Sequence, residues 1–374
     1  MHIEPFAVEI WMNATEKACR YNIAETCVNS IGLGELMEMT GQAEAIWRDL
    51  GALKLTYGEI EGSLRLRRAI AGLYAGRSPD EVLITHGAIG ANALTYQALI
   101  EPGDEVVSIV PAYQQHTAIP ESLGATVKRL LLKPENRYLP NLAELAAMVT
   151  PKTKLVVLTN PNNPTGSRLD EAMLQAIVAI AAKSGSWVLC DEVYRGVAPD
   201  EARLPSSIAD LYAKAIAIGS MSKAFALAGL RLGWIAAPAE VLNKVMIHRD
   251  YNTISVSRID DLLAAVALEN RDRLLKRNRA IVAHNLEILD SWVAREPRIS
   301  WVRPTGGTVT LLRYDSTIAS EDFCRRLLNQ TGVLLVPGSA FEQESTLRIG
   351  FGNATAALTD GLAALSRYLK VLPQ

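Results

Sequence analysis

The chain has 374 residues, 49% of them hydrophobic, and a formal net charge of −2 at pH 7. This length suits a large and a small domain, and the apolar content excludes a wholly disordered chain. The near-zero charge excludes bulk attraction to nucleic acid or anionic membranes, and the longest apolar runs are too short to span a membrane.

Short, almost continuously apolar runs alternate with helix-like segments between about residues 45 and 250. Runs without polar alternation suit strands that are buried on both faces of a mostly parallel sheet. Amphipathic segments separate them, as in residues 169–185, where Gly185 marks the end of a helix. The order strand, helix, strand therefore predicts a doubly wound α/β domain. The runs are EVLIT (81–85), EVVSIV (105–110), TVKRLLL (126–132), KLVVLTN (154–160), WVLCDEVY (187–194), KAIAIGS (214–220) and RLGWIAAP (231–238).

The pattern changes after residue 260. Residues 261–295 predict one long helix or two consecutive ones, and shorter strands interleaved with helices follow. We therefore expect a large domain over residues 45–255 and a smaller α+β domain built from residues 1–44 and 256–374. The later strands are expected in ISWVRP (299–304), GTVTLLRY (307–314), GVLLVPG (332–338) and TLRIGF (346–351).

Three loops of the first domain follow predicted strands and suit ligand binding. THGAIGAN (85–92) combines glycine and small residues before a helix, so its backbone N–H groups can approach a phosphate. NPNNPTG (160–166) is a rigid proline and glycine loop at the carboxyl end of a strand, where open α/β sheets bind ligands. CDEVYRG (190–196) ends the next strand with an acidic pair after the apolar residues WVLC.

The segment SMSKAFALAGLRLGW (220–234) is the most informative one. Lys223 lies among small residues, with hydroxyls at Ser220 and Ser222 and a guanidinium at Arg231. A lysine in this setting can form a Schiff base with a carbonyl cofactor, while the hydroxyls and the arginine hold a phosphate.

Together these motifs resemble the class I/II aminotransferases, which are pyridoxal-phosphate-dependent enzymes of fold type I. The resemblance runs from about Thr56 to Phe351. It implies that Lys223 holds pyridoxal 5'-phosphate as an internal aldimine and later removes the Cα proton of an L-α-amino acid. It also implies two further catalytic residues: Asp191 pairs with the pyridine nitrogen, and Tyr113 stacks on the ring. The remaining cofactor-binding residues that it implies are Gly87, Ala88 and Ile89 in the phosphate cup, Asn163 and Tyr194 at the phenolic oxygen, and Ser220, Ser222 and Arg231 at the phosphate.

Two more residues are matched by the same resemblance. Arg348, in TLRIGF, matches the arginine that grips the substrate α-carboxylate, with Asn163 as a second substrate-binding residue. Tyr57 matches a tyrosine that reaches the phosphate of a partner subunit. The resemblance thus implies a homodimer with composite active sites, a small amino acid as substrate, and no nucleic-acid or membrane partner.

The N-terminal part departs from the family. Residues 21–36 lack the glycine and proline of the usual I-x-L-x-x-G-x-P-D segment. Residues 32–36, the THG turn and residues 249–257 are similar to capreomycidine synthase-type enzymes, which eliminate and cyclise a hydroxylated arginine. Two activities therefore stay open: an aminotransferase, which we favour, and a β- or γ-eliminating lyase or cyclase on a functionalised, for instance guanidino-type, amino acid. Glu25 is either a carboxylate for a basic substrate tail or a solvated or capping residue, and His86 and Arg249 are equally open between a ligand role and a structural one.

Other classes of protein find less support. The GAIGAN segment lacks the GxGxxG spacing of nicotinamide dehydrogenases. The four cysteines have no CxxC spacing and the five histidines no HExxH pattern, so we expect free thiols and no metal site. The N-terminal residues lack a basic segment followed by an apolar run, and we therefore expect a cytoplasmic protein.

Overall fold

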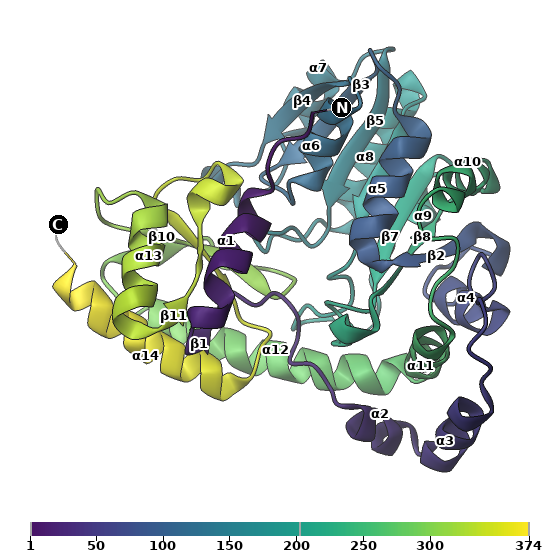
Figure 1. The fold of residues 1–374 in the computed structure, drawn as a ribbon. Coiled ribbons are helices and arrows are strands. Elements are labelled where there is room, and N and C mark those ends of the chain that lie inside the picture. Colours follow the sequence, from purple (N-terminus) through teal and green to yellow (C-terminus); the bar gives the residue numbers. More distant parts are fainter. Residues whose placement is uncertain (1, 202, 373–374) are drawn as a thin grey trace.

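A computed structural model describes residues 2–201 and 203–372 and contains a large mixed sheet of seven strands (Figure 1). The strand order is β2-β8-β7-β6-β5-β3-β4. All neighbouring pairs are parallel except those of β8, which runs antiparallel to both β2 and β7. Each predicted apolar run of this region forms one strand, which confirms the α/β prediction. The strands are β2 (Val82–His86), β3 (Glu105–Val110), β4 (Thr126–Leu131), β5 (Thr153–Thr159), β6 (Trp187–Asp191), β7 (Ala215–Ser220) and β8 (Leu232–Ala236).

Helices cover both faces of this sheet, because alternate residues of the buried strands point to opposite sides. One apolar cluster joins Val157 and Ile218 to α5 (Gly87–Leu99) and α10 (Ala239–Asp250). The other joins Val156 to α8 (Glu171–Ser184). The α8 helix begins where the Asp170 side chain accepts a hydrogen bond from Met173 N, and it ends at Gly185, whose φ is 71°. The remaining helices beside this sheet are α4 (Leu64–Ala71), α6 (Gln115–Ser122), α7 (Leu142–Met148) and α9 (Ile208–Leu211).

A second, antiparallel sheet of four strands has the order β12-β13-β10-β9. The predicted strand at 332–338 is divided, because Val333 and Leu334 pair with β1 while Val336 and Pro337 pair with β13. Two helices occupy residues 261–295, one of the two alternatives expected, and α12 runs beneath both sheets toward α11 in Figure 1. These elements are β1 (Tyr21–Asn22), β9 (Ile299–Trp301), β10 (Val309–Tyr314), β11 (Val333–Leu334), β12 (Val336–Pro337), β13 (Thr346–Gly350), α11 (Arg258–Glu269), α12 (Arg271–Val293), α13 (Ser320–Thr331) and α14 (Thr355–Val371).

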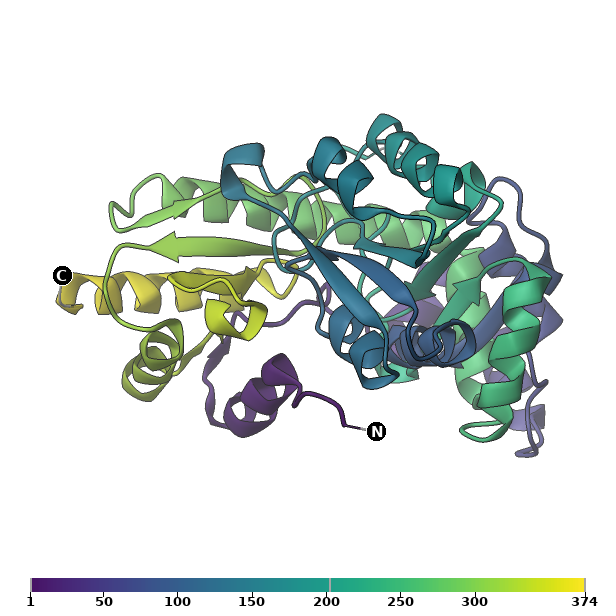
Figure 2. The same ribbon diagram turned by 90° about the horizontal axis from the view of Figure 1, so that it is seen from above.

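The N-terminal helix α1 (Ala7–Thr15) lies between the two parts of the molecule in Figure 1, and Figure 2 shows that it packs to one side of both sheets. Its first residue donates a backbone hydrogen bond to Gln114 Oε1 beside the large sheet, at 2.9 Å. Trp11 Nε1 donates to Leu335 O beside the small sheet, also at 2.9 Å. This helix therefore bridges the two parts of the molecule. The chain then passes through α2 (Leu33–Thr40) and α3 (Ala43–Ala52) to the far end of the large sheet.

Five single turns of 3₁₀ helix complete the described secondary structure: η1 (Glu16–Ala18), η2 (Pro79–Glu81), η3 (Pro134–Asn136), η4 (Ala228–Leu230) and η5 (Gly338–Phe341). Among residues 2–201 and 203–372, no helix combines the length and apolar character that crossing a membrane requires.

Candidate active site

A cavity of about 360 Å³ lies at the carboxyl edge of the large sheet, where Thr159 of β5, Asp191 of β6 and Ser220 of β7 end their strands. Ligands of open α/β sheets bind at this edge. Twelve of the thirteen residues expected from the sequence line this one cavity, although they come from distant parts of the chain. These are Gly87, Ala88, Ile89, Tyr113, Asn163, Asp191, Tyr194, Ser220, Ser222, Lys223, Arg231 and Arg348.

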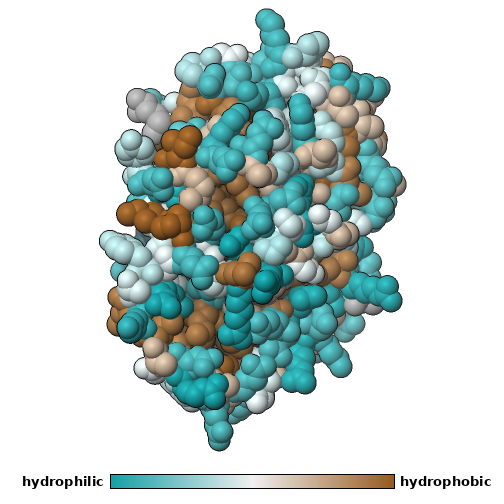
Figure 3. Space-filling view, turned by 90° about the vertical axis from the view of Figure 1, so that its right-hand side faces the viewer, coloured by the Kyte–Doolittle hydropathy of each residue, from teal (hydrophilic) through white to brown (hydrophobic). Residues whose placement is uncertain are grey.

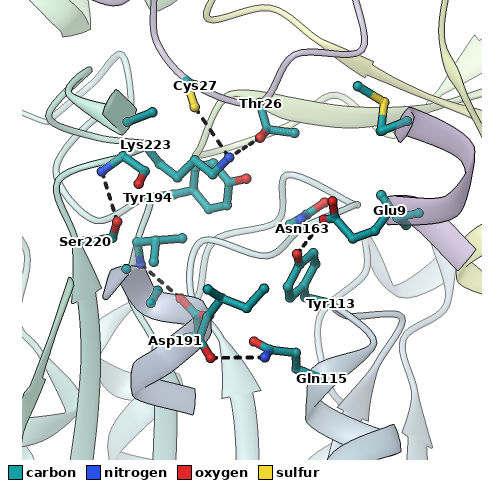
Figure 4. Close-up of a pocket in the computed structure, with 18 of the residues that line it drawn as sticks. Glu9, Thr26, Cys27, Tyr113, Gln115, Asn163, Asp191, Tyr194, Ser220 and Lys223 are labelled. Atoms are coloured by element: carbon teal, nitrogen blue, oxygen red, sulfur yellow. Dashed lines mark hydrogen bonds between the residues drawn. The ribbon is translucent and has the colours of Figure 1, made fainter. Parts of the chain in front are cut away.

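Lys223 lies at one end of the cavity, beneath the segment that follows β1 (Figure 4). Its Nζ donates a short hydrogen bond to Thr26 Oγ1 and lies 3.4 Å from Cys27 Sγ. Burial disfavours the charged amine, but the electrostatic effect of Cys27, Tyr194 and Glu25 outweighs burial and raises the pKa of Lys223 above its ordinary value. A free Lys223 amine is therefore charged at neutral pH. Thr26 and Cys27 carry no local sequence pattern, and their role beside the lysine was not expected.

The start of α5 and the neighbouring strand β8 form a tight backbone cup. Gly87 has a φ of 68°, and a Cβ atom at this position would lie 3.1 Å from Arg231 Nη2. A Cβ atom on Gly233 would lie 2.4 Å from the carbonyl carbon of Gly87 and 2.5 Å from Ala88 N. Only glycine at position 233 permits this approach. Open N–H groups at a helix start, with a guanidinium beside them, fit a phosphate group.

Asp191 lies at the floor of the cavity and is only 5% exposed. Its Oδ2 accepts a hydrogen bond from Asn92 Nδ2 at 3.1 Å and lies 3.5 Å from His116 Nε2. His116 is held in turn by Tyr96, whose hydroxyl is 2.8 Å from Nδ1. A buried carboxylate fixed in this way fits the protonated nitrogen of a pyridine ring. Asn92 ends the THGAIGAN motif and His116 lies on a helix without a motif, and for neither residue was a contact with Asp191 expected.

Arg348 enters the cavity from β13 and is 3% exposed. Its Nη1 donates to Asn163 Oδ1 at 3.3 Å and its Nη2 to Ala24 O at 3.2 Å. Its buried Nε has no hydrogen-bond partner among the described residues. A buried guanidinium with an unused donor suits a carboxylate ligand.

Asn163 owes its position to the rigid loop after β5. Asn162 Nδ2 donates to Pro111 O at 3.2 Å, and Asn162 Oδ1 accepts from Thr165 N at 3.2 Å. The loop ends at Gly166, where φ is 70° and a Cβ atom would lie 2.4 Å from Val309 O. The loop is therefore clamped against β10 of the second sheet.

Helix α1 supplies a wall of the cavity that the sequence did not suggest. The Tyr113 hydroxyl donates to Glu9 Oε1 at 2.7 Å (Figure 4). The Phe6 ring, just before the helix, lies 4.7 Å from the Tyr113 ring. Glu25 faces the same cavity from the segment after β1, and its Oε1 accepts hydrogen bonds from Thr26 N at 2.7 Å and Cys27 N at 2.8 Å. Glu25 thus caps its own backbone turn and also lines the cavity.

Three residues singled out from the sequence lie elsewhere. Tyr57 lines a second cavity beside Val256 and is 78% exposed. His86 precedes α5 and is exposed. Arg249 is fully buried, and its Nη1 contacts Ile60 O.

Comparison with known proteins gives consistent matches over the whole chain. A family model described as "Aminotransferase class I and II" matches residues 39–365. Capreomycidine synthase of Streptomyces vinaceus is 33% identical over 97% of this chain and 93% of its own length. The crystal structure of a PLP-dependent aminotransferase from Streptococcus suis 89-1591 superposes with a TM-score of 0.96 at 40% identity and covers 100% of both chains. That of the PLP-dependent cyclase OrfR superposes with a TM-score of 0.91 at 32% identity and covers 99% of this chain and 98% of its own.

Proposed function

Since this chain belongs to the aminotransferase class I and II family and is a pyridoxal 5'-phosphate-dependent enzyme of fold type I, we propose that it transfers the amino group of an L-α-amino acid. The observation that carries this proposal is the single cavity that brings together Lys223, Asp191 and Arg348. A lysine, a buried carboxylate and a buried guanidinium are the groups that this chemistry needs at the Cα proton, the ring nitrogen of the cofactor and the substrate carboxylate.

The residues of the cavity fit the cofactor. When bound, pyridoxal phosphate supplies an electrophilic carbonyl and a ring that accepts electrons from the bond broken at Cα. Asp191 would hold the ring nitrogen, and Tyr113 would cover the ring face. The phosphate would be held by Ser220, Ser222, Arg231 and the backbone of Gly87, Ala88 and Ile89, and the phenolic oxygen by Asn163 and Tyr194.

The protein contributes orientation and proton transfer. Arg348, with Asn163 beside it, would grip the α-carboxylate and so fix the direction of the Cα–H bond. Lys223 Nζ would take the Cα proton, and the Thr26 hydroxyl already lies where it accepts a hydrogen bond from the resulting ammonium. The fixed charge of Asp191, supported by Asn92, would stabilise the electron-rich state.

We further propose a homodimer in which Tyr57 reaches the phosphate of the partner subunit. Tyr57 is exposed, as are Leu55 at 84% and Tyr251 at 93%. On the side of the molecule that carries α4 and α10, Figure 3 shows apolar side chains gathered between hydrophilic ones. Exposed aromatic and aliphatic side chains of this size favour a protein interface.

A second candidate activity is elimination or cyclisation on a functionalised amino acid. The capreomycidine synthase relative and the similarity to a PLP-dependent cyclase favour it. Lys223, Asp191 and Arg348 serve both activities equally, because each begins with removal of the Cα proton.

A half-reaction without keto acid distinguishes the two activities. Cofactor-loaded enzyme is mixed with a panel of L-amino acids, including arginine and its oxygenated analogues, while absorbance, ammonia and products are followed. Stoichiometric conversion to pyridoxamine phosphate, with one keto acid per site and no ammonia, supports the aminotransferase. Continued turnover with release of ammonia or another leaving group supports the lyase or cyclase. In the control, Lys223→Ala should lose the visible absorbance of lysine-bound cofactor, and an unchanged spectrum would contradict the site.

A further inference from the structure

We propose that the cavity selects an α-amino acid with a cationic, arginine-like side chain, which the carboxylates of Glu9 and Glu25 bind together. This inference rests on the proposed function of the site and goes further, because it names the class of side chain accepted. It also predicts rejection of acidic amino acids.

The two carboxylates reach one cavity from separate elements. Glu9 projects from α1 (Figure 4) and Glu25 from the segment after β1, and both are among the residues that line the cavity with Lys223 and Arg348. Each uses one oxygen locally: Glu9 Oε1 accepts from the Tyr113 hydroxyl, and Glu25 Oε1 accepts from backbone N–H groups. The second oxygen of Glu9 has no hydrogen-bond donor among the described residues, and the Glu25 carboxylate has in addition only a hydrogen-bonding interaction with the thiol of Cys27.

Both carboxylates lack a close cationic partner among the residues that the structure describes. In the parts of the chain that the structure describes, neither Glu9 nor Glu25 is within 4.0 Å of a lysine, arginine or histidine nitrogen. Burial opposes ionisation of Glu25, but Lys223 and the backbone N–H groups of Thr26 and Cys27 lower its pKa below the ordinary value. Glu25 is therefore negatively charged at neutral pH.

An independent observation indicates where the other end of the ligand lies. Arg348 is buried, lines the same cavity, and has an Nε donor without a partner among the described residues. Glu25 and Glu9 both act electrostatically on Arg348, so the three side chains lie in one neighbourhood. A ligand whose carboxylate sits on Arg348 therefore extends its remaining atoms toward two carboxylates.

The charges of the lining residues determine whether the side chain of the bound amino acid should be positive or negative. The lining cations are Lys223, Arg231 and Arg348. In the proposed function Arg231 and Arg348 are occupied by the phosphate and the α-carboxylate, and Lys223 acts as the base at Cα, so none of the three is left to pair with a lining carboxylate. Asp191 is occupied by the ring nitrogen, so the other lining carboxylates, those of Glu9, Glu16 and Glu25, have no cation to pair with. A cationic tail supplies one, whereas an acidic tail adds a further negative charge in a partly desolvated space.

The arrangement favours a guanidinium over an ammonium group. Glu9 and Glu25 come from different elements, α1 and the segment after β1, and both line the cavity. A planar guanidinium has five N–H donors pointing outward in a fixed fork, so it can bond two separate carboxylates at once. The amino acid expected is therefore arginine or a close guanidino analogue.

The test measures binding without turnover. The Lys223→Ala variant, loaded with pyridoxal phosphate, is titrated by calorimetry with L-arginine, L-citrulline and L-aspartate. Citrulline matches arginine in length but is neutral at its tip. We expect arginine to bind at least about tenfold more tightly than citrulline, and aspartate to bind most weakly, since a charge-assisted hydrogen bond contributes roughly tenfold to 100-fold in affinity.

Variants in the same background identify the residues responsible. Glu9→Gln and Glu25→Gln should each weaken arginine binding about tenfold and change citrulline binding less than about threefold. Glutamine keeps the oxygen that accepts the existing hydrogen bonds of Glu25, so the turn is preserved. Glu4→Gln, an exposed carboxylate of the same segment outside this cavity, should leave arginine binding unchanged.

The outcomes separate this inference from the proposed function. If cofactor binds and all three amino acids bind equally, or if neither glutamine variant affects arginine, the selection of a cationic tail is wrong while the proposed function stands. If the unmodified protein binds no cofactor, or if cofactor binds and no amino acid does, the proposed function itself is wrong.

Discussion

The approach of Gly233 to the start of α5 allows a sharp test of the phosphate cup. In Gly233→Ala, the added Cβ would lie 2.4 Å from the carbonyl carbon of Gly87, 2.5 Å from Ala88 N and 2.7 Å from Gly87 O. All three are backbone atoms, so no side-chain rotation relieves the contact, and the first turn of α5 must shift. Overpacking of this kind costs about 1–3 kcal/mol. If that cost is relieved by moving the N–H groups of the cup, affinity for the cofactor falls by about fivefold to 150-fold.

The assay is a titration of cofactor-free protein with pyridoxal phosphate, followed by visible absorbance. Gly229→Ala is the matched control, because it lies in the same region and a Cβ atom there has nothing within 4 Å. Circular dichroism and a denaturant titration should show that both variants are folded. A folded Gly233→Ala that binds cofactor within about twofold of the unmodified protein would refute the reasoning that this contact shapes the cup.

Three further predictions address the surroundings of Lys223 and Asp191. Thr26→Val removes the hydroxyl bonded to the Lys223 amine, and NMR should show that exchange of the substrate α-hydrogen in D₂O slows at least about tenfold. The Thr26→Ser control should stay within about threefold of the unmodified protein, and equal rates for all three proteins would exclude a positioning role for Thr26. His116→Phe removes the imidazole beside Asp191 and should weaken cofactor binding about tenfold in the absorbance titration, whereas unchanged binding would show that Asp191 needs no such support. Burial, opposed by Lys223, raises the pKa of Cys27 to about 11. Alkylation of Cys27 in the cofactor-free protein, followed by mass spectrometry, should therefore be slow at pH 7 and become about tenfold faster per pH unit up to the pKa. Fast labelling at neutral pH would contradict the raised pKa.

The sequence predicted most of the large sheet because its strands are buried on both faces and read as apolar runs. The sequence also predicted that the residues of the separate motifs lie together at one edge of the sheet. Asn163, Asp191 and Ser220 follow or end β5, β6 and β7, which are neighbours in the sheet although about thirty residues separate them along the chain. The carboxyl ends of parallel neighbours lie at one edge, so motifs at strand ends are brought together by topology.

The residues that were missed depend on contacts between distant segments. Glu9 and Tyr113 are 104 positions apart, and Thr26 and Lys223 are 197 positions apart. Neither Glu9 nor Thr26 stands in a pattern, since each acquires its neighbour only when the N-terminal segment crosses the cavity. The division of residues 332–338 into two strands could likewise not be predicted from the sequence, because it results from pairing with β1 on one side and with β13 on the other.

Helix α1 contributes a chemical group and a structural bridge with the same nine residues. Its Glu9 carboxylate accepts a hydrogen bond from Tyr113, and two residues later the Trp11 indole donates a hydrogen bond to the backbone near the small sheet. The floor of the cavity, with Asp191 and the phosphate cup, belongs to other parts of the chain. Replacement of this helix therefore changes one wall of the cavity, while Asp191 and the phosphate cup stay in place. This makes α1 the natural segment to exchange when a new side-chain preference is to be engineered or evolves.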